Sequence, residues 1–201
     1  MRGSRYSAEW STDEARLRVT EPTPSEVRAA ARALSADYNE PTNRALMTND
    51  TVMSEGDVVA MFEQMWSDGG RPFLLYRDDA LVGDCDLRDI EEGQAEVAIM
   101  VGPRDAQGKG LGTRFSVMTL AIAFGPLHLS RVYASVRPEN AGSLRMFEKV
   151  GYAIDESARA RRYAGAPDDV CLSIDRDRLA RAHPRALANV IVAVRAAEPS
   201  P

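Results

Sequence analysis

The spacing of hydrophobic positions changes from a helical period to a two-residue period near the middle of the chain. Apolar side chains recur every three or four residues in segments 25–38 and 58–66, which predicts two amphipathic helices. Ser25 is the expected cap of the first, and Ser54 with Asp57 resembles a capping box for the second. Residues 39–53 show neither period and are expected to be loop.

Three following segments alternate between apolar and polar residues: 72–78, 80–90 and 95–101. Short turns separate them, which predicts an antiparallel meander. An earlier strand is expected at 16–22 and later ones at 131–136 and 169–174, with helices after Leu111 and from Asn140 to a cap at Gly151. The segment 159–162, between the last two strands, is expected to be a solvated loop, with contact to an acceptor or a second subunit as the alternative. The pattern predicts an α+β fold with a mixed, mostly antiparallel twisted sheet flanked by helices on both faces.

The expected domain boundaries follow from the same pattern of apolar and polar residues. Residues 1–14 are polar and expected to be a flexible segment, 15–180 form a single domain, and 181–201 are a tail that is either helical or disordered. A length of 201 residues suits one domain of this kind.

The composition indicates which kinds of molecule the protein is expected to bind. The formal net charge of −5 argues against nucleic acid and anionic membranes and favours a cationic substrate. The N-terminus lacks the apolar stretch of a signal peptide, and no apolar run approaches the ~20 residues of a membrane span, so a cytoplasmic location is expected. Cys85 and Cys171 are expected to be free thiols, and no metal-ligand spacing appears. The chain is expected to be a monomer or a homodimer.

The segment "AQGKGLGT" places glycines at 108, 110 and 112, between a predicted strand and a predicted helix. It matches neither the P-loop pattern nor the dinucleotide fingerprint. Glycines at a helix start let backbone N–H groups converge on one point, which suits a pyrophosphate. A glycine-rich turn without a ligand is the alternative interpretation.

"QGKGLGT" resembles the Q/R-x-x-G-x-G/A motif of the GNAT superfamily of acyl-CoA-dependent N-acyltransferases, with Gln107, Gly110 and Gly112 on its defined positions. "VRPENAGSLRMFEKVGY" is similar to the family segment that closes over the pantetheine arm. The resemblance covers roughly residues 72–175 and looks most like the branch that acetylates the N-termini of ribosomal proteins. It implies the GNAT fold, with about six to seven strands.

The resemblance also implies acetyl-CoA as cosubstrate and a strand at 95–101 that parts from its neighbour near Met100. Its free backbone groups would bond the pantetheine and polarise the thioester oxygen. Lys109 is expected to point to solvent. The residues expected to bind the cofactor are Ile99, Met100, Val101, Gln107, Gly108, Lys109, Gly110, Leu111, Gly112, Thr113, Asn140 and Phe147.

Acetyl transfer to an amine needs a base, and Glu96 is the candidate, since related enzymes carry an acid there and its side chain faces away from the apolar row. A surface ion pair is the alternative. Asp84 and Asp86 lie on one face of the neighbouring strand, where they bind a cationic acceptor or are simply solvated. Asn140 either caps its helix or also touches the cofactor. Phe147 replaces the tyrosine that protonates the thiolate in many relatives, which leaves Ser143 or water for that role.

The sequence therefore predicts an N-acetyltransferase that works by direct attack in a ternary complex. The acceptor is expected to be a small-molecule amine, with a protein N-terminus as the other option. The alternative function is a non-catalytic acyl-CoA sensor or interaction module, which Phe147 favours and Glu96 opposes.

Overall fold

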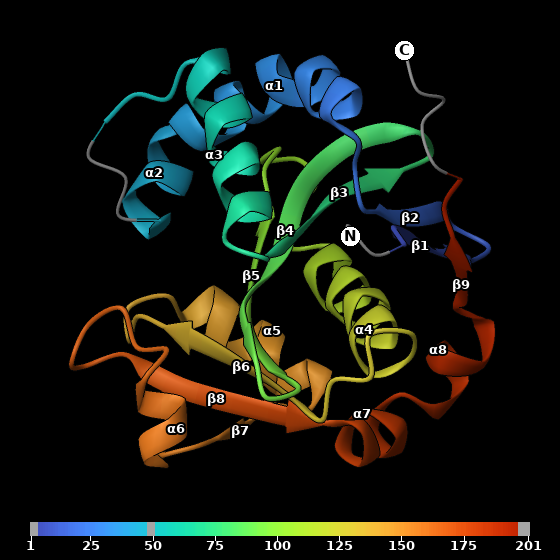
Figure 1. The fold of residues 1–201 in the computed structure, drawn as a ribbon, viewed down its shortest axis with the longest axis vertical. Helices are drawn as coiled ribbons and strands as arrows, with labels where there is room; N and C mark the ends of the chain where they lie inside the picture. The colour runs from blue at the N-terminus through green and yellow to red at the C-terminus, as the bar shows by residue number, and fades with distance from the viewer. Residues whose placement is uncertain (1–3, 48–50, 197–201) are drawn as a thin grey trace.

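The chain folds around one twisted sheet with helices on both faces (Figure 1). The computed structural model describes residues 4–47 and 51–196. Within them the sheet has nine strands in the order β7-β8-β6-β5-β4-β3-β2-β1-β9, more than the six or seven expected. The strands are β1 (Tyr6–Ser11), β2 (Arg16–Thr20), β3 (Arg71–Arg77), β4 (Ala80–Glu91), β5 (Gln94–Val101), β6 (Arg131–Val136), β7 (Ala153–Ile154), β8 (Val170–Asp175) and β9 (Ile191–Val194).

Eight helices connect these strands in the described residues: α1 (Pro24–Asn39), α2 (Pro41–Met47), α3 (Glu55–Ser67), α4 (Leu111–Phe124), α5 (Ala141–Val150), α6 (Ala158–Arg161), α7 (Arg176–Ala182) and α8 (Pro184–Asn189). Successive residues of β4 show which face each helix covers. Asp84 meets Tyr38 of α1, whereas Cys85 meets Thr119 of α4. Because neighbouring strand residues point to opposite faces, α1 and α4 cover opposite faces of the sheet.

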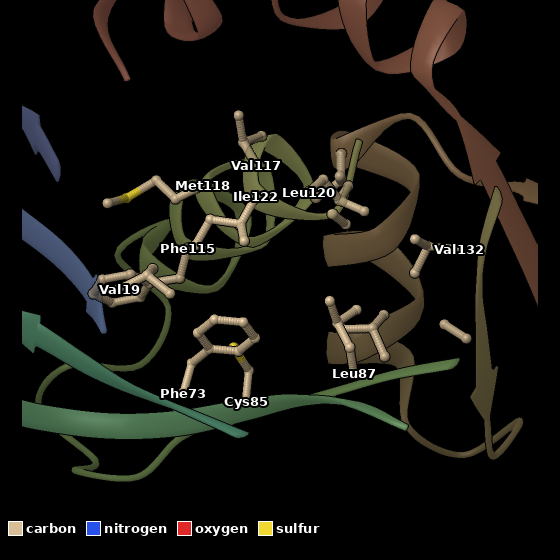
Figure 2. Close-up of a cluster of buried hydrophobic side chains, with 14 of the residues drawn as sticks. Val19, Phe73, Cys85, Leu87, Phe115, Val117, Met118, Leu120, Ile122 and Val132 are labelled. Atoms are coloured by element: carbon tan, nitrogen blue, oxygen red, sulfur yellow. The ribbon is translucent and has the colours of Figure 1, made fainter. Parts of the chain in front are cut away.

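The main core lies between α4 and the sheet. Figure 2 shows α4 side chains, among them Phe115 and Ile122, gathered with Phe73, Cys85 and Leu87 of the sheet. A second core packs α1 and α3 against the other face, with Leu34, Phe62 and Leu74 at its centre. Since both faces of β4 are covered in its middle, its polar side chains Asp84 and Asp86 are buried as well.

β5 and β6 are parallel and pair over three residue pairs, the last of which joins Glu96 to Tyr133. β5 runs on to Val101 and β6 to Val136. The two strands therefore part immediately after Glu96, four residues earlier than the expected point near Met100. The β4–β5 ladder continues to Gly83–Val101, so only one edge of β5 is released.

Both ends of the described chain join the sheet, which corrects the expected flexible N-terminus and the uncertain tail. Tyr6–Ser11 forms β1 between β2 and β9, with Ala8 buried. Ile191–Val194 forms β9 after the short helix α8. Their alternation is short and weak, so backbone pairing decides these strands: β1 pairs with the adjacent β2 and with the distant β9. Residues 1–3 and 197–201 of the two predicted segments lie outside the described residues.

Three local expectations were also wrong. Residues 41–47, expected as loop, form α2, whose one buried side chain in the described residues is polar, so no apolar period could reveal the helix. The cap of α1 is Thr23 in a capping box with Glu26, rather than Ser25. The segment 159–162, expected as a solvated loop, is partly the capped helix α6 and pairs with acids of the β4–β5 turn. The capping box of α3 is confirmed.

Candidate functional site

The glycine segment forms an open turn before α4. Gly108 and Gly110 have φ values of 73° and 76°, in the left-handed region that favours glycine. A Cβ atom added at either residue would meet nothing within 4 Å. Both glycines are therefore needed for backbone conformation, and the space above them is free.

Gly110 stands at the N-cap position of α4, and no side chain among the described residues bonds to the first turn. The first N–H groups of a helix have no partner within the helix, and the helix dipole adds a partial positive charge there. Leu111, Gly112 and Thr113 supply these donors beside the open space. The arrangement fits an anion such as a pyrophosphate.

Gln107 turns its side chain inward. Its Nε2 donates to the carbonyl oxygens of Val101 at 2.8 Å and Gly102 at 3.1 Å, and to Oδ1 of Asn43 at 2.9 Å. Its Oε1 accepts from Arg104 at 2.8 Å. The first residue of the motif thus helps to hold the end of β5, and its side-chain amide forms its hydrogen bonds within the protein.

The released part of β5 contains the three strand residues expected at the cofactor. Ile99 and Val101 pack on the main core, and Met100 packs on the core under α1. Their side chains are thereby fixed on both faces of the sheet. What they offer at the opening between β5 and β6 is the backbone of one strand edge.

On the other side of the opening, Asn140 caps α5, and its side chain accepts from the backbone N–H of Ser143 at 3.0 Å. Capping is confirmed, while contact with a cofactor stays a prediction. Phe147 lies one turn further along the helix, buried edge-on against Tyr152 with 4.9 Å between ring centroids. The Tyr152 hydroxyl is buried and has no hydrogen-bond partner.

Asp84 is buried between β4 and α1, with 6% of its surface exposed. The Tyr38 hydroxyl donates to its Oδ2 at 2.6 Å, whereas Oδ1 has no partner. Burial raises the pKa of Asp84 to about 7, although the Tyr38 hydrogen bond opposes that rise. The expected solvated face does not exist at this position, because α1 covers it.

Asp86 is also buried, at 3% exposed, and binds Arg88 through two hydrogen bonds of 2.6 Å. Arg88 stands directly opposite Glu96 in the β4–β5 register. Its guanidinium is turned to Asp86, and none of the ion pairs in the described residues involves Glu96. The cross-strand ion pair that was the alternative for Glu96 therefore does not form.

Glu96 is partly buried at the point where β5 and β6 part. Burial raises its pKa to about 7, and the positive charge of Arg88 opposes that rise. A carboxyl with this pKa is half ionised near neutral pH, which suits a general base. Glu96 thus has the protonation behaviour that the sequence hypothesis requires.

Two further carboxylates join this face without having been singled out from the sequence. Burial raises the pKa of Asp37, on α1, to about 6. Asp169 precedes β8, accepts from Ser135 at 2.8 Å, and has a buried Oδ1 with no partner. Asp37 and Tyr38 lay in a predicted helix, but which sheet residue they would meet was not visible. Asn43 lay in a segment predicted as loop.

Two features are absent from the described residues, 4–47 and 51–196. They contain no group of three or more metal-binding side chains. None of their helices is long and apolar enough to cross a membrane. Both cysteines are free, as predicted, and both are buried.

Comparison with known proteins places this geometry in a family. Residues 16–153 match the family described as "Acetyltransferase (GNAT) domain". The probable N-acetyltransferase YjcK of Bacillus subtilis is 36% identical over 84 residues, which are 41% of this chain and 46% of that protein. The spermidine N(1)-acetyltransferase of Escherichia coli is 30% identical over 87 residues, which are 42% and 46%. The chain spans about half the length of the curated relatives it matches.

Among solved structures, Mycobacterium smegmatis RimJ in complex with CoA-disulfide superposes with a TM-score of 0.73, 17% identity and coverage of 92% of this chain and 95% of that one. A likeness at this identity shows the shared fold. The expected GNAT fold is therefore confirmed.

The burial of Asp84 makes stability depend on pH. Its pKa rises from 3.8 to about 7 on folding, so between these values the folded chain holds a proton that the unfolded chain has lost. The Asp84 contribution to the free energy of unfolding therefore falls as pH rises from about 4 to about 7. We predict that Asp84→Asn, which keeps an acceptor for Tyr38, is more stable than wild type at pH 8 by about 1–3 kcal/mol.

Urea unfolding at pH 4.5 and pH 8 measures this difference, which should shrink at the lower pH. The exposed Asp89→Asn removes the same charge from the same strand and should change stability little at either pH. Equal stability of wild type and Asp84→Asn at pH 8 would show that Asp84 carries no buried charge.

Proposed function

The chain belongs to the GNAT acetyltransferase family, and from this premise we propose that it moves the acetyl group of acetyl-CoA to a primary amine. The observation that carries the proposal is the joint placement of three features at one opening of the sheet. They are the uncapped start of α4, the released edge of β5 and the carboxyl of Glu96. Named N-acetyltransferases among the relatives support it.

The backbone of residues 108–113 would hold the pyrophosphate, and the edge of β5 at 99–101 would bond the pantetheine arm. Neither role needs a charged side chain, because the donors are main-chain N–H groups. Lys109 is exposed and is not required for the cradle. The free space above Gly108 and Gly110 fits this assignment.

When bound, acetyl-CoA supplies an acetyl group on a thioester. Glu96 accepts the proton that the acceptor ammonium must lose, directly or through water. The neutral amine nitrogen then bonds to the carbonyl carbon and gives up its second proton. The carbon–sulfur bond breaks, and the sulfur leaves with the bonding pair and takes up a proton. Phe147 cannot donate that proton, so it comes from Ser143 or water. A thiol of ordinary pKa near 8.5 leaves readily as a thiolate and needs little help from an acid.

The acceptor in this proposal is a small molecule with more than one positive charge. Asp84, Asp86 and Glu96 lie on one face of the sheet, and the charge of Asp37 on α1 acts on Asp84. Arg88 is the cation in this group, and it is already bound to Asp86. Cationic groups of a substrate would offset this negative charge. One relative is a spermidine acetyltransferase. The free thiols and the use of acetyl-CoA fit a cytoplasmic protein.

A pair of variants at Gly110 tests the cradle. Gly110→Asn and Gly110→Asp have nearly the same shape, and asparagine and aspartate both tolerate left-handed backbone. We expect aspartate to weaken coenzyme A binding at least about tenfold more than asparagine, since like charges about 4 Å apart near a protein surface repel by about 4 kcal/mol. Calorimetric titration with coenzyme A gives the comparison. Equal affinities in two folded variants would remove the cradle assignment.

Glu96→Gln tests the base. We expect kcat to fall by roughly 10²–10⁴, the range for a positioned acid or base. In wild type, kcat/KM should rise with pH through about 7, because Glu96 must be ionised. Burial is the main cause of the raised pKa of Glu96, and the positive charge of Arg88 opposes it. Nearby negative charges raise the pKa further: Asp86, Asp89 and Asp169.

In Glu96→Gln, the rise of kcat/KM with pH through about 7 should flatten or move to another pH. Glu91→Gln, an exposed glutamate of the same hairpin, should keep both kinetic constants. If Glu96 only binds a cation, KM rises while kcat stays. Wild-type kcat at saturation with an unchanged pH limb would exclude the catalytic role.

An acceptor panel read by thiol release from acetyl-CoA tests the proposed substrate class. We expect 1,4-diaminobutane and spermidine to react with lower KM than butylamine. Asp84→Asn should reduce this preference, and Asp89→Asn should not. A preference for peptides would point to a protein N-terminus instead. Coenzyme A binding without transfer to any amine or peptide would favour the non-catalytic sensor.

A further inference from the structure

The buried side chain of Asn43 joins three segments that are far apart in sequence. It is 4% exposed on a helix whose other described residues are partly or fully exposed. Nδ2 donates to the carbonyl oxygens of Asp37 and Gly102, both at 2.9 Å, and Oδ1 accepts from Gln107 at 2.9 Å. One amide thus connects the end of α1, the end of β5 and the loop that leads to α4.

The end of β5 is held from two sides at this point. The carbonyl oxygen of Gly102 accepts from Asn43 and from Gln107. The carboxylate of Asp37 occupies the space where a Cβ of residue 102 would lie, at 2.2 Å, so only glycine allows α1 this close. β5 has lost its β6 partner in this region, and these contacts fix its terminal residues together with the β4 ladder, which continues to Gly83–Val101.

Asn43 also sets the place of α2 beside the opening. Ala45 and Leu46, two and three residues further along α2, line a cavity of about 130 Å³ whose other wall is formed by Arg137, Glu139 and Asn140. That wall leads directly into α5. The position of Asn43 therefore decides both where the glycine turn begins and how far α2 stands from α5.

We propose that Asn43 is a positioning residue for cofactor binding, which it serves through Gln107 and the end of β5 without touching the cofactor. Its amide both donates and accepts, so it can satisfy two carbonyl groups and one amide N–H at once. Alanine would remove the three hydrogen bonds that join the end of α1, the end of β5 and Gln107, and it would let the glycine turn and α2 shift apart. The inference rests on the proposed function, because the ligand it positions is coenzyme A.

Asn43→Ala tests the proposal by calorimetric titration with coenzyme A. We expect the Kd to rise about tenfold or more, because the glycine turn and the end of β5 would no longer be held in the arrangement that binds the ligand. Asn39→Ala is the matched control. Its amide also joins α1 to a distant segment, through Nδ2 to the Met53 carbonyl at 2.7 Å and Oδ1 from the Met53 N–H at 2.8 Å, but it does not contact β5.

The control should lower the melting temperature by a similar amount and leave the Kd unchanged. A double-mutant cycle adds a second readout. If Asn43 acts through Gln107, the fold-increase in Kd of the double variant Asn43→Ala/Gln107→Ala should be well below the product of the fold-increases of the two single variants. Should Asn43→Ala not fold, Asn43→Ser replaces it in both measurements.

An unchanged Kd in the folded Asn43 variants, or an equal rise in Asn39→Ala, would overturn the positioning role. So would independent effects in the cycle. A wild-type protein that does not bind coenzyme A would instead refute the proposed function. The two failures are therefore distinguishable.

Discussion

The parallel pairing of β5 with β6 stops after three residue pairs, and the rest of the site depends on that stop. It releases one edge of β5 and leaves Glu96 at the point where the strands part. A strand that loses a neighbour needs its unpaired groups satisfied in another way. At the end of β5 the protein supplies Gln107 and Asn43, and further back the edge stays available for a ligand.

The released edge lies beside a helix start that has no side-chain cap. An ordinary helix is stabilised by a serine, threonine or aspartate at this position, as α1 and α3 are by Thr23 and Ser54. α4 begins instead at Gly110 in a left-handed conformation. The protein gives up roughly a few tenths of a kcal/mol of capping there, and in return the free N–H groups can bind an anion.

The acidic face opposite α4 carries a similar cost. Asp84 and Asp169 each bury an oxygen without a partner, and Tyr38 offsets only part of the desolvation of Asp84. The attraction between β4 and α1 is therefore weaker than an apolar contact would give. A positively charged acceptor would relieve this cost, so the same groups that weaken the free protein favour the bound one.

The sequence by itself determined the elements whose pattern is strong and local. The glycine turn, the caps at Ser54, Asn140 and Gly151, and the three-stranded meander could be read from it, and with them the family and the candidate base. Tertiary structure alone decided where β5 and β6 part, that α1 covers Asp84, and that β1 and β9 join the sheet. It also decided that Asn43 is buried. Each of these depends on which distant backbone or side chain becomes a neighbour, and a pattern along the chain records periodicity but not partners.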